Sequence, residues 1–280
     1  MIWRTSKREI PLDRTLVMGI LNVTPDSFSD GGQIATVDDA LRRVEQMVSE
    51  GADIIDVGGE SSRPGSIQIT SDEEMRRVAP VVEAVARRFD VPMSVDTYKS
   101  AVAKAAGDAG AEIVNDISAF RFDPAMAATV SNASMAVIPM HSRGTFETLH
   151  STAPADDIFE DVKAYLSRAI NAALAAGILP DAIALDVGIG FGKTLEQNLS
   201  LIADLERVRE VFPEYPLVIG TSRKSFIGKI MDGAAVNNRL EGSLATAVIA
   251  AYNGVNIVRT HDIKETSAAL QMVDAICKEH

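Results

Sequence analysis

The fold is decided by a six-residue pattern that occurs three times: Gly51-Ala-Asp-Ile-Ile-Asp56, Gly110-Ala-Glu-Ile-Val-Asn115 and Gly254-Val-Asn-Ile-Val-Arg259. In each copy the glycine follows a stretch with helical spacing, where a positive φ angle carries no Cβ penalty. A short turn and two adjacent β-branched residues come next, and a polar residue closes the run. The pattern therefore predicts a helix that ends, a tight turn and a strand that is buried on both faces.

Short apolar runs without alternation predict eight strands, at 16–21, 54–57, 93–95, 113–114, 135–140, 183–185, 217–219 and 257–258. Helical spacing between them predicts eight helices, at 37–50, 71–85, 100–109, 124–130, 157–176, 195–212, 242–253 and 263–278. Ser71 and Glu74 have the spacing of a capping box at the start of the second helix. Eight alternating units favour a single α/β domain over 1–280, a (β/α)8 TIM barrel, over an open doubly wound sheet. Residues 1–15 are expected to form a short lead-in segment.

The composition excludes several classes of protein. The net charge is −12 over 280 residues, which lacks the basic character that is typical of a nucleic-acid-binding protein. Residues 1–16 lack the apolar core of a signal peptide, and no run reaches the roughly 18 apolar residues that cross a bilayer. Cys277 is the only cysteine, which rules out an intramolecular disulfide and a cysteine-based metal cage. We therefore expect a reducing, cytoplasmic location.

A polar or charged residue follows each predicted strand. These residues are Asn22, Asp56 with Glu60, Asp96, Asn115 with Asp116, His141, Asp186, 222–224, and Arg259 with His261. In a barrel the carboxyl ends of all strands meet at one rim, which carries the active site. The acceptors Asp96, Asn115 and Asp186 suit a planar ring rich in N–H groups. The donors Lys224, Arg63, Arg259 and His261 suit a phosphate or carboxylate. We therefore predict one site for a heterocyclic, anionic ligand.

The glycine-rich segments do not match nucleotide-binding motifs. Residues 188–194 resemble a Walker A loop, but Val187 stands at the first glycine position, and the dinucleotide spacing is absent as well. The segments 22–32 and 58–65 instead predict functional loops. Oxygen atoms in 22–32, including that of Asn22, suit a hard cation such as Mg²⁺. A serine-hydrolase elbow and a structural zinc site have no support.

The motifs resemble those of the dihydropteroate synthases. The resemblance begins with Met18-Gly-Ile-Leu-Asn-Val-Thr-Pro-Asp-Ser-Phe-Ser-Asp-Gly-Gly32 and Asp56-Val-Gly-Gly-Glu-Ser-Ser-Arg-Pro-Gly65. It continues in order through Ser94-Val-Asp96, Asn115-Asp116, Asp186 with Gly190-Phe-Gly-Lys193, Ser222-Arg-Lys-Ser-Phe226, Gly242-Ser-Leu-Ala245 and Arg259-Thr-His-Asp262. The resemblance covers nearly the whole chain.

This resemblance implies a fold, a reaction and a set of partners. The family forms (β/α)8 barrels, usually homodimers, that join 4-aminobenzoate to (7,8-dihydropterin-6-yl)methyl diphosphate. The products are 7,8-dihydropteroate and diphosphate, on the route to folate. Mg²⁺ assists the reaction and sulfonamides compete with the aminobenzoate. The partners are thus two small molecules and a second copy of the chain, with no nucleic acid or membrane.

The resemblance also assigns roles to residues. The catalytic set is Asp96, Asp186, Lys224, Arg259 and His261. Asp96, Asn115, Asp186 and Lys224 hold the pterin, whereas Ser62, Arg63, Arg259 and His261 meet the diphosphate. The aminobenzoate pocket consists of Ser62, Arg63, Pro64, Phe191 and Ser222, and the turn at Ser222 precedes a helical stretch whose N-terminus is expected to receive the carboxylate. Asn22 ligates Mg²⁺.

The chain departs from the family pattern at several positions. Val187 replaces the usual proline, Ser62 replaces the commoner threonine, and 65–70 lacks a proline. The loop 141–150 departs most, which bears on aminobenzoate binding and sulfonamide response. Two alternatives stay open from sequence: a barrel that transfers a methyl group from methyltetrahydrofolate to a corrinoid protein, and a pterin-binding protein without catalysis. The first needs no diphosphate loop, and the second would bind ligand without turnover.

Overall fold

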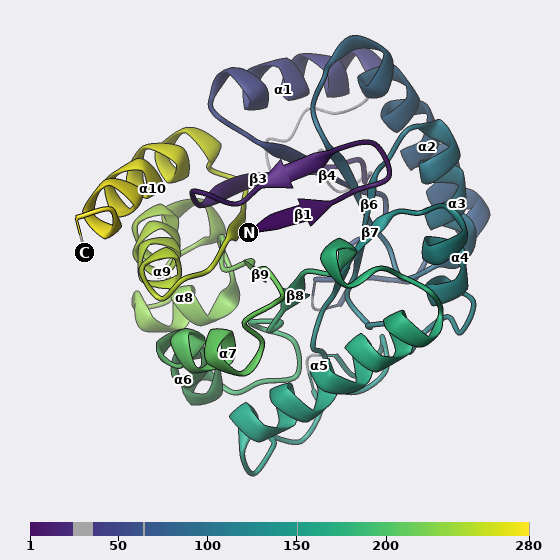
Figure 1. Cartoon of the computed structure of the whole chain (residues 1–280). Coiled ribbons are helices and arrows are strands. Elements are labelled where there is room, and N and C mark those ends of the chain that lie inside the picture. The colour runs from purple at the N-terminus through teal and green to yellow at the C-terminus, as the bar shows by residue number, and fades with distance from the viewer. Residues whose placement is uncertain (25–35, 64, 150, 280) are drawn as a thin grey trace.

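The computed structural model describes residues 1–24, 36–63, 65–149 and 151–279. Eight parallel strands form one sheet, with helices between consecutive strands on its outside (Figure 1). The strands are β3 (Leu16–Asn22), β4 (Ile54–Gly58), β5 (Met93–Asp96), β6 (Ile113–Asp116), β7 (Ala136–Pro139), β8 (Leu185–Asp186), β9 (Leu217–Ile219) and β10 (Ile257–Thr260). Single bridges between Val137 and Ile183 and between Met140 and Asp186 join the two end strands. The barrel prediction is confirmed, and the open sheet is excluded.

The apolar runs are buried on both faces, as expected for strands that lie between a barrel interior and a ring of helices. The strand predicted at 183–185 has different bounds in the structure. Ile183 forms a single bridge with Val137 directly after the 3₁₀ turn Pro180–Ala182, and the continuous strand β8 runs from Leu185 to Asp186. Asp186 therefore lies within the strand, at the rim.

Ten α-helices occur in the described ranges: α1 (Val37–Ser49), α2 (Ser71–Arg88), α3 (Ser100–Ala109), α4 (Met126–Asn132), α5 (Ile158–Ala175), α6 (Leu195–Ala203), α7 (Leu205–Val211), α8 (Ser225–Ile230), α9 (Leu240–Tyr252) and α10 (Ile263–Cys277). The helix predicted at 195–212 is two helices, since the backbone of Asp204 (ψ 12°) interrupts it. The capping box at Ser71 and Glu74 is wrong. Thr70 caps α2 instead, accepting from the N–H of Glu73, and the Glu74 side chain turns to Lys99.

The predicted lead-in segment contains a hairpin. Its strands β1 (Ile2–Arg4) and β2 (Glu9–Pro11) pair antiparallel, and Trp3 and Ile10 are buried in the core. Arg8 ion-pairs with Asp90 at 2.8 Å and with Glu112 at 2.8 Å. Since Asp90 and Glu112 precede β5 and β6, the hairpin lies at the amino ends of the strands.

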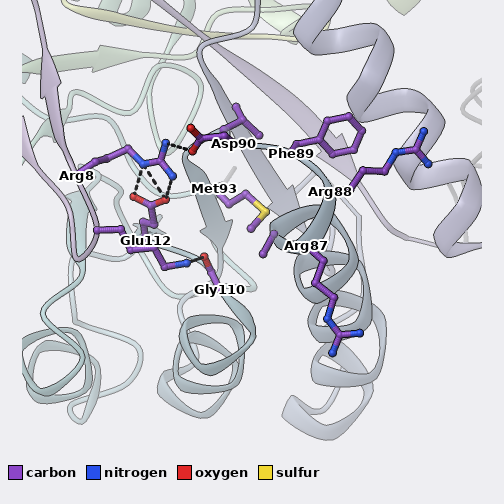
Figure 2. A pocket seen from close by; sticks show the side chains of 11 residues that line it. Arg8, Arg87, Arg88, Phe89, Asp90, Met93, Gly110 and Glu112 are labelled. Carbon is purple, nitrogen blue, oxygen red and sulfur yellow. Dashed lines mark hydrogen bonds and ion pairs between the residues drawn. The ribbon is translucent and has the colours of Figure 1, made fainter.

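A pocket of about 420 Å³ lies beside this hairpin, between Arg8 and the C-terminal ends of α2 and α3. Figure 2 shows Arg8 between the carboxylates of Asp90 and Glu112 in that pocket. The Lys7 ammonium donates to the carbonyl oxygen of Gly110 at 2.6 Å, after the last residue of α3. The cations of the hairpin thus neutralise carboxylates and helix C-termini at the end of the barrel opposite to the predicted rim.

Candidate active site

The carboxyl ends of four strands bring Asp56, Asp96, Asn115 and Arg259 together. Arg259 lies on β10, and its Nε donates to Asp56 Oδ2 at 2.6 Å while a terminal nitrogen donates to Asp96 Oδ2 at 2.7 Å. Asn115 Nδ2 donates to the same Asp56 oxygen at 3.2 Å. Asp96 and Asn115 are register partners on neighbouring strands. The predicted convergence at one rim is therefore found for these residues.

The position of Arg259 corrects the expected division of the rim. The sequence grouped Arg259 with an anion-binding side, apart from the acceptors. In the structure its guanidinium lies among the acceptors, held by Asp56 and Asp96. Burial raises the pKa of Asp96 to about 7, although Arg259 favours the charged form. Asp56 was predicted at the rim from its position at a strand end, but it was given no role in binding or catalysis.

Asp186 and Lys224 form the adjoining part of the site. Asp186 Oδ1 accepts from the N–H of Gly188 at 2.7 Å. Burial raises the pKa of Asp186, opposed by the charge of Lys224. Burial likewise lowers the pKa of Lys224 to about 8, against the pull of Asp186. The two groups are close enough to influence each other, as the sequence-based assignment requires.

The loop after β8 contacts the side chain of Lys224. Lys224 Nζ donates to the carbonyl oxygen of Ile189 and lies 4.7 Å from the centre of the Phe191 ring. Gly190 has φ 87°, and a Cβ there would lie 3.2 Å from Lys224 Cδ. A larger residue at 190 would thus be strained and would crowd the lysine. Phe191 and Lys224 together form an apolar wall with a cation above it.

His261 lies against Ser222 at the rim. Its Nδ1 lies 3.0 Å from Ser222 Oγ, and its backbone N–H donates to the same oxygen at 3.2 Å. Burial and the neighbouring arginines, first Arg259, lower the pKa of His261 to about 3. The imidazole is therefore neutral at pH 7 and can meet an anion through a ring N–H but not through a charge.

The turn at Ser222 precedes a helix, as the sequence predicts. Helix α8 begins at Ser225, three residues beyond Ser222, and Lys224 is its N-cap residue. The hydroxyl of Ser222 is engaged by His261 and not by the helix. Ser222 keeps its place at the rim, but its role toward an aminobenzoate stays a prediction.

The remaining predicted residues lie on the loops. Ser62 lines a small cavity with Asp96, Tyr98 and Phe146, and the charge of Arg63 is felt at His261. The segment after β4 thus approaches both the acceptors and the histidine. Pro64, predicted for the aminobenzoate pocket, and most of 22–32 lie outside the described residues.

His141 follows the strand predicted at 135–140, and in the structure its side chain is fully buried. Nε2 lies 3.3 Å from Asp161, and Nδ1 lies 2.8 Å from the ammonium of Lys193. Burial and then Lys193 lower the pKa of His141 to about 4. Lys193 also donates to the carbonyl oxygens of Gly188 and Phe191, at 2.7 and 3.2 Å. These two residues therefore support the loop after β8.

Comparisons with known proteins show which proteins the chain resembles. Residues 18–261 match the family described as pterin binding enzyme. The chain is 45% identical to the dihydropteroate synthase of Clostridium beijerinckii, covering 95% of this chain and 96% of that protein. It is 44% identical to that of Escherichia coli K12, covering 95% and 93%.

Two solved structures show the same likeness. The dihydropteroate synthase of Yersinia pestis in a sulfonamide drug complex superimposes with a TM-score of 0.94, at 41% identity over all of both chains. The Xanthomonas albilineans dihydropteroate synthase with 4-aminobenzoic acid gives a TM-score of 0.91, at 39% identity over 99% of this chain and 98% of that one.

Proposed function

This chain belongs to the dihydropteroate synthase family of pterin-binding enzymes, and from that premise we propose how its residues divide the work of the reaction. The enzyme joins (7,8-dihydropterin-6-yl)methyl diphosphate to 4-aminobenzoate and releases 7,8-dihydropteroate and diphosphate, a step of folate biosynthesis. The amine nitrogen bonds to the methylene carbon, the carbon–oxygen bond to diphosphate breaks, and the amine loses a proton. The observation that carries our assignment is the meeting of Asp96, Asn115 and Arg259 at one rim, with Asp186 and Lys224 beside them.

The acceptors bind the pterin in this proposal. Asp96, Asn115 and Asp186 offer oxygen atoms to the N–H groups of the ring, and Asn115 and Lys224 offer donors to its nitrogen and carbonyl acceptors. Because these side chains are buried, their hydrogen bonds are stronger than in water and exclude rings of different pattern. The pterin delocalises charge that develops on the methylene carbon, so the protein has mainly to stabilise the departing diphosphate.

The diphosphate is placed beside Arg259, where Ser62, Arg63 and His261 provide donors. Two of the five guanidinium N–H groups of Arg259 are engaged by Asp56 and Asp96, which fixes the orientation of the group. Arg259 therefore both holds Asp96 for the pterin and presents positive charge to the leaving group. The neutral His261 contributes a hydrogen bond rather than a charge.

The aminobenzoate pocket is assigned to Ser62, Arg63, Pro64, Phe191 and Ser222. The Phe191 ring provides an apolar face next to Lys224, and Arg63 suits the carboxylate. A sulfonamide has the same aniline ring and an acidic group in place of the carboxylate. We expect it to compete with 4-aminobenzoate and not with the pterin, which steady-state inhibition patterns test.

Asn22 is proposed as a ligand of Mg²⁺. A Cβ on Gly58 would lie 3.5 Å from Asn22 Oδ1 and 3.8 Å from Asp96 Oδ2, so both oxygens border the same bare backbone. Among the described residues, no three acidic, histidine or cysteine side chains form a metal cage. This donor set fits Mg²⁺, which takes few protein ligands and completes its shell with phosphate oxygens and water. The bound ion would neutralise charge on the diphosphate.

A direct assay tests the function and the metal together. Dihydropteroate formation from both substrates is measured with and without Mg²⁺, at fixed ionic strength. We expect turnover that needs both substrates and falls when the ion is chelated. Ca²⁺ serves as the control cation, because it is larger and prefers more oxygen ligands. Equal rates with and without Mg²⁺ would remove the proposed role of Asn22.

Lys224 should give the reaction an alkaline limit. The ammonium is charged below its pKa of about 8 and neutral above it, so binding of an anionic substrate weakens as the pH rises. We expect kcat/KM for the pterin diphosphate to fall about tenfold per pH unit above about pH 8, since this ratio reports the free enzyme. The variant Lys224→Arg stays protonated throughout and should lose this limb. The same limb in both proteins would assign it to another group.

A homodimer is proposed through α9 and α10, which pack beside each other in Figure 1. Helix α9 is apolar on almost every face, a feature of helices covered on both sides. Its buried face contacts the barrel, yet Ile249 and Tyr252 are exposed, as are Met272 and Ile276 on α10. Exposed apolar side chains on two neighbouring helices suit an identical partner.

The substitutions Tyr252→Glu and Met272→Glu should halve the mass measured by light scattering. Both side chains are more than 60% exposed, so the monomer should keep its fold. Leu179→Glu, at an exposed apolar site before β8, is the matched control and should leave the mass unchanged. An α9 or α10 variant with the mass of the parent would refute this interface.

A cytoplasmic location is proposed on the basis of the cysteine content. Cys277, the only cysteine, is an exposed free thiol, which suits a reducing compartment. None of the helices in the described part of the chain has both the length and the apolar character to cross a membrane.

A further inference from the structure

We propose that Lys99 is a positioning residue, which holds the loop after β4 over the reacting groups through a buried cluster with Glu60 and Glu74. The inference rests on the proposed function, because that loop carries Ser62 and Arg63. Lys99 forms no hydrogen bond or ion pair with a residue assigned to either substrate, and it belongs to none of the sequence motifs. Its role is read from its contacts alone.

The ammonium of Lys99 joins three segments of the chain. It donates to the carboxylate of Glu60, to Glu74 Oε2 at 2.6 Å and to the carbonyl oxygen of Ile69 at 2.8 Å. Lys99 precedes α3, Glu74 lies in the first turn of α2, and Glu60 and Ile69 bracket the loop. The side chains of Lys99, Glu60 and Glu74 are only 12, 5 and 1% exposed. The cluster is therefore an interior junction and not a surface ion pair.

The two ends of the loop are tied to each other at this junction. Glu60 Oε1 accepts from the N–H of Ile69 at 3.1 Å, which closes the base of the segment 61–68. Tyr98 donates to the other Glu60 oxygen at 3.0 Å, and Gln68 donates to the Tyr98 hydroxyl at 2.9 Å. The far part of the loop is open, since Ile67 is 84% exposed. The direction of the loop is thus set at its base.

The charges of the cluster explain why Lys99 is needed. Two buried carboxylates face one lysine, so removal of the lysine leaves two like charges together. A buried ion pair that loses one partner is strongly unfavourable. We expect the base of the loop to separate, with Glu60 turning away from Glu74.

The same cluster borders the pterin side of the site. A small cavity is lined by Glu60, Glu74, Ser62, Asp96 and Phe146. A shift of Glu60 therefore changes the position of Ser62 relative to Asp96, while Asp96 itself stays held by Arg259. Loss of Lys99 should therefore disturb the substrate contacts made by the loop, whereas the residues that accept hydrogen bonds from the pterin should stay in place.

The test compares Lys99→Met with the parent enzyme. Lys104→Met is the matched control, because this lysine lies on α3 with 68% of its side chain exposed. We expect kcat/KM for the pterin diphosphate to fall about 100-fold in Lys99→Met, the size of effect that misplacement by about 1 Å produces. Calorimetry with a pterin lacking the diphosphate should show a Kd within about threefold of the parent, as expected when only the loop moves.

A merely structural role for Lys99 would lower kcat/KM and raise the Kd for the pterin together, and that result would overturn the proposal, as would an unchanged kcat/KM. If Lys99→Met does not fold, Glu60→Gln replaces it, since the glutamine keeps an acceptor for the Ile69 N–H and weakens the lysine contact. The same split between kcat/KM and Kd is expected, and its absence overturns the proposal.

Arg63→Ala separates this inference from the proposed function. If it leaves kcat/KM unchanged, the assignment of the loop to the substrates is wrong. If it lowers kcat/KM and Lys99→Met does not, only the role of Lys99 is wrong.

Discussion

Asp186→Ala should lower the affinity for a pterin at least about 100-fold and leave the barrel folded. The buried carboxylate is an acceptor for adjacent N–H groups of the ring, and hydrogen bonds to charged groups contribute about 1.5–3 kcal/mol each. Loss of two such bonds corresponds to a fall of that size or more. Calorimetry with a pterin that lacks the diphosphate measures the effect without catalysis.

Asp186→Asn is the matched control for the loop. Asparagine keeps an oxygen for the N–H of Gly188, which Asp186 Oδ1 now accepts at 2.7 Å, but it places a donor where the second carboxylate oxygen was. We expect Asp186→Asn to bind the pterin as weakly as Asp186→Ala, with the thermal stability of the parent. An affinity within a few-fold of the parent in both variants would place the ring elsewhere.

The burial of Asp186 also bears on the choice of ligand. Burial raises the pKa of this group, and Lys224 and then Arg259 oppose the shift. A ring that donates two hydrogen bonds supplies the stabilisation that water cannot supply to a buried carboxylate. The same reasoning applies to Asp96, which has Arg259 on one side.

The fold was predictable because its signal is local. A glycine after a helix and an adjacent pair of β-branched residues mark one strand–helix unit, and Gly51, Gly110 and Gly254 all take positive φ angles in the structure. The hairpin at the amino end was missed, because each of its strands has three residues and only one buried side chain. The break at Asp204 was missed as well, since the apolar spacing continues across it.

The convergence of the strand-end residues at one rim was predictable, but the pairing of their side chains was not. Strand ends in a barrel converge at one rim, so Asp96 and Asn115 could be grouped from sequence. Arg259 reaches past β3 to side chains on β4 and β5, and this depends on the length and rotamer of one arginine. The neutrality of His261 likewise follows from burial among arginines, which no spacing encodes.

Lys99 and Glu74 had no signal of this kind. Both lie at the starts of helices, where Glu74 is an ordinary acidic residue of the first turn and Lys99 makes no capping hydrogen bond. Their meeting is set by the packing of α2 against α3 and becomes visible only in three dimensions. Positioning residues of this type are thus harder to predict than the groups that contact a substrate.

Arg259→Met should have the largest effect on both stability and catalysis. The methionine fills the space but leaves Asp56 and Asp96 without their counter-ion, and removal of one partner from a buried pair costs about 3–5 kcal/mol. For a chain of this size that corresponds to a fall in melting temperature of about 6–10 °C. We expect kcat/KM to fall roughly 100- to 1000-fold, as when a donor to the departing charge is removed.

The pH dependence of the loss of stability in Arg259→Met identifies its cause. Burial already raises the pKa of Asp96 to about 7, and removal of Arg259 raises it further. Because the folded variant then holds a proton that the unfolded chain has released, its stability falls as the pH rises. The difference in melting temperature between variant and parent should therefore widen above pH 7 and narrow toward pH 5. The triple variant Arg259→Met/Asp56→Asn/Asp96→Asn has neither of the orphaned carboxylates, so its deficit should be nearly independent of pH. A deficit that stays constant with pH in the single variant would show that lost packing, and not the buried carboxylate, is responsible.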